Sequence, residues 1–396
     1  MNALLNEICG KYTIPQETKA AGIYPYYKPI SSGQDPIVKM ADGSSVMMFG
    51  SNSYLGLSDD PRLKEAAIKA IEKYGTSCSG SRFLNGTLDI HEELEEKLAR
   101  FVGKDQAVTF STGFQVNLGV ISALGFRGGY ILLDDTDHAC IIDGSRLSWS
   151  TVYKFKHNDM DALEKKLKAC EPDAPKMIVV DGVYSMLGDL CPLPQICELA
   201  EKYNASVMVD DAHGLGVFGK NGSGTADYFG LTDKVDLIMG TFSKSFGSLG
   251  GFIAGSEPAI NFLKHNARSL IFSASMTPAA VAAASKALDI MQSEPERIEH
   301  LWDITRYAHA KFRENGFDIN ATQSPIIPLM VRDTRKAMQI VTLAYNEGVF
   351  ITPVIAPAVP EKDVLIRFAL MATHTKEHID IAVEKLTKIF KQLDVI

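Results

Sequence analysis

The amino-acid sequence predicts an α/β protein with a mostly parallel sheet in a large domain, followed by a smaller α+β domain on the C-terminal side. Between about residues 105 and 255, short apolar runs alternate with helix-like stretches. Runs that are apolar along their whole length are typical of strands buried on both faces of a parallel sheet. After about residue 285, the pattern changes to a long helix, three strand-like runs and a final helix. This second pattern indicates an α+β unit.

The expected elements follow one another along the chain. Residues 1–35, rich in Tyr and Pro, are expected to form a helix and then an arm. Asp60-Pro61 supplies an N-cap and a first-turn proline for a helix over 63–74. In the large domain we expect strands at 107–111, 130–133, 177–180, 207–209, 237–239 and 252–254, and helices at 115–124, 161–170 and 193–203. In the small domain we expect a helix at 295–315, strands at 326–331, 349–354 and 365–369, and a last helix at 376–393. The predicted division is an N-terminal helix and arm (1–45), a large domain (46–285) and a small domain (286–396).

Composition excludes several classes of protein. The 396 residues are 46% hydrophobic and 22% charged, with a net charge of −8 and no dense Lys/Arg block, so we expect no nucleic-acid partner. The six cysteines form no C-x-x-C pair, which favours reduced thiols in a cytoplasmic protein. Residues 1–12 lack the apolar core of a signal peptide, and no run approaches the roughly 18 apolar residues of a membrane span. Peripheral contact with a membrane stays open.

Polar or glycine residues follow five of the predicted strands. These segments begin at Thr112, Asp134, Asp181, Asp210 and Gly240. In an open α/β sheet, ligands bind at the carboxyl ends of the strands. One such segment carries little information, but five in order predict a ligand site along one edge of the sheet.

Lys244 and Asp210 are the first candidates for chemistry at this edge. The hydroxyls and glycines of residues 241–247 suit a phosphate, and Lys244 among them can act as a Schiff-base amine if its pKa falls. The alternative is a solvated loop lysine. Asp210, at the end of a buried strand, needs a cationic partner such as a pyridinium nitrogen. The alternative is a cap of the following turn, a role we assign to Asp211.

Two histidines and a glycine pair complete the predicted site. His138 and His213 each follow a strand; one can stack on an aromatic cofactor ring and the other can approach its phenolic oxygen, although single histidines are often structural. Cysteines and carboxylates near them lack zinc spacing, so no metal is expected. Gly113-Phe114 lies where a strand turns into the helix predicted at 115–124; exposed amides at a helix N-terminus bind anions, unless this is an ordinary strand–helix turn.

One motif at residues 214–219 is misleading. It matches the glycine spacing of dinucleotide-binding proteins, but it runs into the glycine-rich 220–224 and cannot open a helix. We therefore expect no NAD.

Several segments together resemble a known family. Residues 50–57, 80–87 and 272–275, with the five strand ends, resemble PLP-dependent enzymes of the aspartate-aminotransferase fold type, and among these the α-oxoamine synthases. Those enzymes condense an amino acid with an acyl-CoA and release CO₂ and CoA. The resemblance runs from about residue 20 to the end of the chain. Residues 82–91, 242–245 and 368–375 are most similar to the soluble, homodimeric bacterial serine palmitoyltransferases. Glycine C-acetyltransferase and 8-amino-7-oxononanoate synthase remain the alternatives.

The resemblance implies a cofactor, substrates and a role for each residue. It implies pyridoxal 5′-phosphate (PLP), L-serine, a long-chain acyl-CoA and a homodimer with active sites at the interface. The implied catalytic residues are Lys244 as Schiff-base lysine and general base, Asp210 at the ring nitrogen, His138 stacked on the ring and His213 near the ring oxygen. Further cofactor contacts are implied for Gly113, Phe114, Ser185, Thr241 and Ser243, and across the dimer for Ser273 and Ala274. Substrate contacts are implied for Asn52, Tyr54 and Arg367, the last binding the carboxylate. One position departs from the pattern, because Ile355 stands where some serine palmitoyltransferases have a second arginine.

Overall fold

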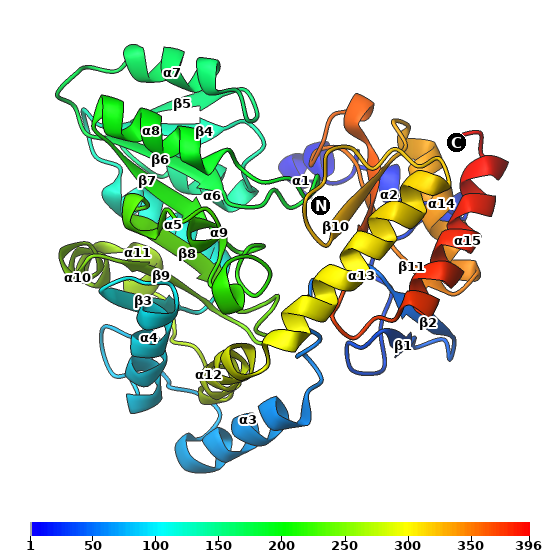
Figure 1. The fold of residues 1–396 in the computed structure, drawn as a ribbon, viewed down its shortest axis with the longest axis horizontal. Helices are drawn as coiled ribbons and strands as arrows, with labels where there is room; N and C mark the ends of the chain where they lie inside the picture. Colours follow the sequence, from blue (N-terminus) through cyan, green and yellow to red (C-terminus); the bar gives the residue numbers. More distant parts are fainter. Residues whose placement is uncertain (1) are drawn as a thin grey trace.

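A seven-stranded sheet forms the centre of the larger part of the molecule, in the order β3-β9-β8-β7-β6-β4-β5 (Figure 1). The computed structural model describes residues 2–396. The strands are β3 (Gln106–Phe110), β4 (Tyr130–Asp134), β5 (Thr151–Phe155), β6 (Lys176–Asp181), β7 (Ala205–Asp210), β8 (Leu237–Thr241) and β9 (Gly251–Gly255). Strand β9 runs opposite to the other six strands of this sheet, because the connection 242–250 holds no helix that could carry the chain back for a parallel pairing. The predicted mostly parallel sheet is confirmed.

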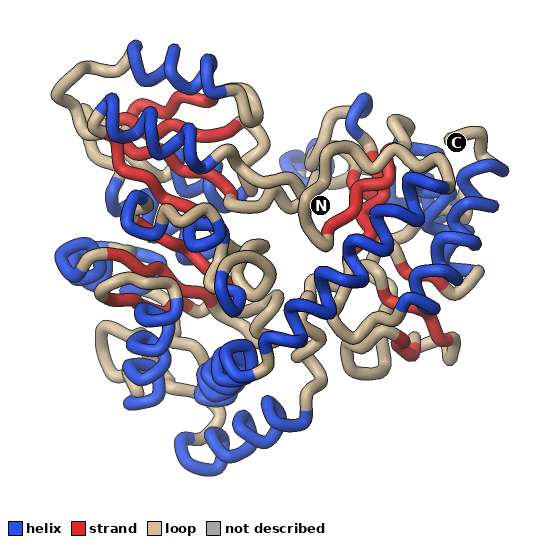
Figure 2. The backbone as a smooth tube through the Cα atoms, viewed as in Figure 1, coloured by secondary structure: helices blue, strands red, loops and turns tan. Residues whose placement is uncertain are grey.

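Helices cover both faces of this sheet, as Figure 2 shows. Along β6, Met177 and Val179 belong to one apolar core, and Ile178 and Val180 to the other. The first core is closed by α5 (Gly113–Leu124), α6 (Ala139–Arg146), α10 (Glu257–Asn266) and α11 (Arg268–Ile271). The second is closed by α4 (Asp89–Phe101), α7 (Met160–Lys168), α8 (Leu193–Tyr203) and α12 (Pro278–Ser293). Burial on both faces explains why these strands are apolar throughout.

Outside these layers, α3 (Pro61–Tyr74) packs on α12. The Asp60 carboxylate accepts a hydrogen bond from the Arg62 N–H at 2.9 Å, which confirms the predicted N-cap. Residues 214–219 form turns and no helix, as expected of the misleading glycine motif. Short helical turns are η1 (Lys220–Gly222), α9 (Thr225–Tyr228), η2 (Thr232–Lys234) and η3 (Glu361–Asp363).

The smaller part holds two three-stranded sheets. One has the order β1-β2-β11 and the other β10-β13-β12. Their strands are β1 (Ile37–Lys39), β2 (Ser45–Met48), β10 (Ile326–Met330), β11 (Val349–Phe350), β12 (Thr352–Val354) and β13 (Leu365–Ala369). Its long helices are α13 (Pro295–Glu314), which leads in from the larger part and is yellow in Figure 1, α14 (Thr334–Asn346) and α15 (Lys376–Gln392).

Two details of the predicted elements are wrong. The single strand expected at 349–354 divides at Ile351, because β11 pairs with β2 while β12 pairs with β13 in the other sheet. The N-terminal segment forms two short helices, α1 (Ala3–Ile8) and α2 (Ile14–Ala20), because Gly10 lies between them and Pro15 starts the second. The division at residues 45 and 285 stays a prediction.

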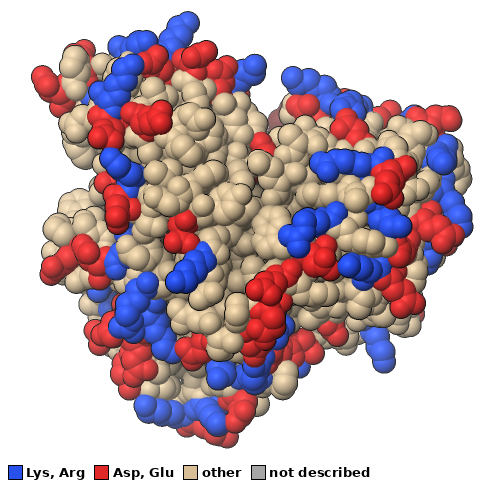
Figure 3. Space-filling model, viewed as in Figure 1, with Lys and Arg blue, Asp and Glu red and all other residues tan. Residues whose placement is uncertain are grey.

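The surface shows no large region of one charge on the face drawn in Figure 3, where Lys/Arg and Asp/Glu side chains are interspersed. Among the described residues, no helix is long and apolar enough to cross a membrane.

Candidate active site

A cavity of about 250 Å³ lies at the carboxyl ends of the central parallel strands. Strands β6, β7 and β8 deliver Asp181, Asp210 and Thr241 to it, and the segments after them deliver the rest. Of the predicted site residues, the lining includes Gly113, Phe114, His138, Ser185, Asp210, His213, Thr241, Ser243 and Lys244. The parallel arrangement brings these residues together although they are far apart in sequence.

The first turn of α5 forms one end of the cavity. Its N-cap, Thr112, accepts a hydrogen bond from the Gln115 N–H at 3.2 Å, while the amides of Gly113 and Phe114 have no acceptor within the helix. The Thr241 and Ser243 hydroxyls lie 3.0 Å apart. A Cβ on Gly113 would come within 2.8 Å of the Thr241 Oγ1, so a side chain there would fill the space between helix and hydroxyls. This end fits a phosphate group.

Asp210 marks the floor of the cavity. Its carboxylate is 3% exposed and accepts hydrogen bonds from the Asn117 Nδ2 at 2.6 Å and the Ala212 N–H at 3.0 Å. Among residues 2–396, no lysine or arginine forms an ion pair with it. A buried carboxylate without a bound cation suits a protonated ring nitrogen. Sequence reasoning missed Asn117, although a buried amide in an otherwise apolar helix is a usable signal.

The neighbouring Asp211 is structural, as predicted, but its carboxylate does not cap the following turn, where Asp210 accepts the hydrogen bond from the Ala212 N–H. Its carboxylate accepts hydrogen bonds from the N–H and the hydroxyl of Thr225, at 2.7 and 2.9 Å. Burial raises the pKa of Asp211 to about 7. The two adjacent carboxylates therefore face different surroundings.

Lys244 lies half-buried on the cavity wall. Burial lowers the pKa of Lys244 to about 8, and the positive charge of Arg367 adds to this, against the opposing attraction of Asp210. An appreciable fraction of the amine is then unprotonated near neutral pH, as a Schiff-base amine requires.

The predicted substrate residues do not line the cavity but connect to it through His213. The Nδ1 of buried His213 lies 2.6 Å from the Tyr54 hydroxyl, which accepts a hydrogen bond from the Arg367 Nη2 at 3.1 Å. The Tyr54 hydroxyl also lies 3.4 Å from the Asn52 Oδ1. Arg367 donates through Nε to the Ser185 carbonyl at 2.8 Å. Burial first, and then the charges of Lys244 and Arg367, hold the pKa of His213 well below its usual range.

Ser273 and Ala274 lie apart from this cavity, beside the start of α5. The Gln115 Nε2 donates to the Ser273 hydroxyl at 3.2 Å, and the Ser111 hydroxyl donates to the Ala274 carbonyl. Neither residue lines the cavity of its own chain. Their expected contact with a second subunit stays a prediction.

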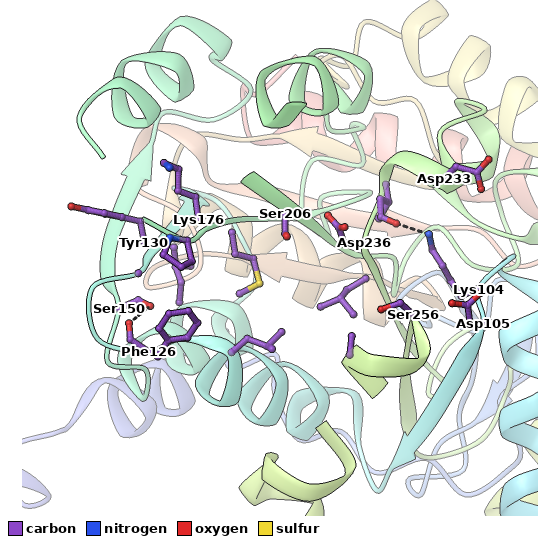
Figure 4. Close-up of a pocket in the computed structure, with 18 of the residues that line it drawn as sticks. Lys104, Asp105, Phe126, Tyr130, Ser150, Lys176, Ser206, Asp233, Asp236 and Ser256 are labelled. Atoms are coloured by element: carbon purple, nitrogen blue, oxygen red, sulfur yellow. Dashed lines mark hydrogen bonds between the residues drawn. The ribbon is translucent and has the colours of Figure 1, made fainter. Parts of the chain in front are cut away.

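A larger cavity, of about 540 Å³, lies at the amino ends of the strands (Figure 4). Lys104, Tyr130, Lys176 and Asp236 are among its lining, and no predicted site residue is. The Lys176 ammonium donates hydrogen bonds to the backbone carbonyls of Pro172 and Ala174, so two of its donors are already paired within the protein. The smaller cavity is the better candidate, because it gathers an amine with a lowered pKa and a buried carboxylate that lacks a cation.

Three comparisons with known proteins agree with the predicted fold type and family. The family model of class I and II aminotransferases matches residues 44–386. Serine palmitoyltransferase of Bacteroides thetaiotaomicron is 61% identical over 99% of this chain and 100% of its own length. An 8-amino-7-oxononanoate synthase of Lysinibacillus sphaericus is more distant, at 43% over 96% of this chain and 98% of its own.

Solved structures agree as well. Serine palmitoyltransferase from S. paucimobilis, solved with a bound PLP–myriocin aldimine, superposes with a TM-score of 0.96 at 33% identity, covering 100% of both chains. The predicted fold type and PLP as cofactor are confirmed. The chain belongs to the class I and II aminotransferase family and, within it, to the serine palmitoyltransferases among the α-oxoamine synthases.

Proposed function

We propose that this protein condenses L-serine with a long-chain acyl-CoA, palmitoyl-CoA in the first place, to give 3-oxosphinganine, CoA and CO₂, the first step of sphingolipid synthesis. The observation that carries the proposal is the placement of Arg367. Among the described residues, this buried guanidinium donates only to a carbonyl and a hydroxyl, and it connects through Tyr54 and His213 to the cavity of Lys244 and Asp210. It is available to the carboxylate of an amino acid bound there.

The residues of the cavity fit PLP. The amides of Gly113 and Phe114 and the hydroxyls of Thr241 and Ser243 would hold its phosphate. The Asp210 carboxylate would accept a hydrogen bond from its protonated ring nitrogen. When bound, PLP supplies an electron sink for negative charge at the amino-acid Cα.

The side chains then divide the remaining work. Lys244, once displaced by the amino acid, removes the Cα proton through its Nζ, a task suited to a pKa near the working pH. His138, which faces the cavity, would stack on the ring, and neutral His213 would approach the ring oxygen. Arg367 orients the substrate carboxylate, with Asn52 and Tyr54 beside it.

A second arginine has no place in this proposal. Ile355, at the position where some relatives carry one, packs against the apolar core. We assign carboxylate binding to Arg367 alone.

The protein is proposed to work as a cytoplasmic homodimer with peripheral access to a membrane. Ser273 and Ala274 do not line the cavity of their own chain, so their assigned phosphate contact requires a second copy of the chain. A long-chain product also requires a lipid surface to receive it.

A CoA-release assay tests the proposal directly. Serine, glycine and alanine are each combined with acetyl-CoA and with acyl-CoAs of increasing length. Because each buried methylene contributes about 0.8 kcal/mol, kcat/KM should rise by up to about fourfold per added methylene until the acyl groove is full. Serine should be preferred throughout. Preference for glycine, or equal rates with acetyl-CoA and palmitoyl-CoA, would assign a sister activity.

A further inference from the structure

Four side chains form a hydrogen-bonded network in the wall of the cavity, which three of them line. The Asn117 Nδ2 donates both to the Asp210 Oδ2 at 2.6 Å and to the Cys140 Sγ at 3.0 Å. The Cys140 Sγ lies 2.8 Å from the His138 Nδ1. The network therefore connects Asp210, assigned to the cofactor ring nitrogen, with His138, assigned to the cofactor ring face.

The direction of each hydrogen bond follows from its partners. A carboxylate only accepts, so Asn117 must point its amide nitrogen at Asp210, and its Oδ1 is left buried without a partner. The His138 Nδ1 accepts from the Cys140 backbone N–H at 3.3 Å, so this nitrogen carries no proton. Cys140 must then donate its S–H to the same nitrogen. Burial, and the negative charge of Asp210, raise the pKa of Cys140, which keeps the thiol protonated.

A close contact between two helices makes the network possible. A Cβ on Gly144 of α6 would come within 2.8 Å of the Asn117 backbone oxygen in α5. The glycine lets the helices approach closely, and Asn117 is thereby brought within reach of Cys140 from the neighbouring helix. Asn117 and Cys140 are 0% and 3% exposed, so water does not compete for these bonds.

We infer that Asn117 and Cys140 are positioning residues: Asn117 orients the Asp210 carboxylate, and Cys140 holds the His138 ring with its proton on Nε2. The inference rests on the proposed function for the roles of Asp210 and His138. Fixing the carboxylate keeps one lone pair directed into the cavity. Fixing the tautomer makes Nε2 a hydrogen-bond donor and not an acceptor.

The tautomer is tested in the protein without cofactor. Apo-protein with ¹⁵N-labelled histidine is studied by NMR at about pH 8, where an ordinary histidine is neutral. His138→Gln assigns the ring signals. Wild type and Cys140→Ser should show a proton on Nε2 and a hydrogen-bonded Nδ1, whereas in Cys140→Ala the Nδ1 signal should move toward that of a free nitrogen. Cys197→Ala, at a buried cysteine in α8, is the control and should leave the signals unchanged. A proton on Nδ1 in wild type, or an identical Nδ1 signal in Cys140→Ala, would overturn the assignment for Cys140.

The role of Asn117 is likewise tested by a substitution and a matched control. Loss of a hydrogen bond to a carboxylate should cost about ten- to a hundredfold in kcat for Asn117→Leu, with little change in the KM for serine. The visible absorbance of added PLP and the affinity of apo-protein for PLP should change too. Ser122→Ala is the control on the same helix, since that hydroxyl bonds only to carbonyls of its own helix. An Asn117→Leu protein with wild-type PLP absorbance, PLP affinity and kcat would refute the role.

The enzymatic function and the positioning roles can be refuted separately. If wild type releases no CoA from serine and acyl-CoA, the proposed function fails. The NMR signals and the PLP titrations need no acyl-CoA, so they still decide the positioning roles. Thermal unfolding of each variant identifies any that is merely misfolded.

Discussion

Replacing Arg367 by methionine should weaken serine binding strongly while changing the free energy of unfolding only slightly. Arg367 is 6% exposed and makes two hydrogen bonds, to the Ser185 carbonyl and the Tyr54 hydroxyl. It has no ion pair with a carboxylate among the described residues. Its burial therefore carries a desolvation cost that no opposite charge offsets in the free protein. Methionine removes that cost along with the two hydrogen bonds of the charged guanidinium, each worth about 1.5–3 kcal/mol, so that the two changes largely cancel. We expect the free energy of unfolding to change by no more than about 2 kcal/mol.

Arg82 provides the matched comparison. It forms an ion pair with Glu95 in which both side chains are nearly buried, at 9% and 6% exposure. The pair also contacts Thr109, whose hydroxyl accepts from the Arg82 Nη1 at 2.7 Å. Arg82→Met leaves the Glu95 charge buried without its partner, and such a loss costs about 3–5 kcal/mol. The same substitution should thus be mild at one position and severe at the other.

Serine affinity should show the opposite order. A charged hydrogen bond to a carboxylate is worth about 1.5–3 kcal/mol, so Arg367→Met should weaken serine binding about 10- to 150-fold. Urea unfolding of the apo-proteins gives the stabilities, and the change in cofactor absorbance on serine addition gives the affinity. An Arg367→Met protein as unstable as Arg82→Met would make Arg367 structural. An unchanged serine affinity would assign the carboxylate to another residue.

Further predictions concern the cofactor and the assembly. Lys244→Ala should abolish turnover and the visible absorbance of bound PLP, checked by spectrum and CoA release; near-normal turnover would remove Lys244 from the mechanism. Because the pKa of Lys244 is lowered to about 8, the amine gains its proton as pH falls through that value, so the rate at which apo-protein combines with PLP should fall from pH 9 to pH 7. Asp210→Asn should keep the fold, as seen by circular dichroism. It should lower kcat by more than about a hundredfold, since a neutral amide no longer stabilises the protonated ring nitrogen. An unchanged kcat would show that Asp210 is not the ring-nitrogen partner, and Asp211 would be tested next. Sedimentation should show a homodimer, and Ser273→Ala should weaken PLP binding; an active monomer would contradict both.

Most of the large sheet could be predicted from sequence because its strands are buried on both faces. Such strands are apolar throughout, and helices separate them along the chain. The strand β5 was missed, because it lies at the sheet edge and its exposed and half-buried residues break the apolar pattern. The pair β1 and β2 was missed for a related reason, since β2 finds its parallel partner β11 some 300 residues further along the chain. Local pattern carries no information about such a partner.

The site residues also differ in whether local sequence pattern predicts them. Lys244, Asp210 and His213 were predictable because each ends or follows a strand, and the carboxyl ends of parallel strands share one edge of the sheet. Asn117 follows no strand and lies in the second turn of α5. Its importance depends on Asp210, which is distant in sequence, and on a glycine contact with α6 that only the three-dimensional packing reveals. Residues proposed to contact the ligand are thus marked by their position in the fold, whereas residues proposed to orient them are marked only by what they touch. Asn117 donates to Asp210 while its own buried Oδ1 has no hydrogen-bond partner among the described residues, which costs stability. Such a cost is expected where a buried polar group is kept for function and not for folding.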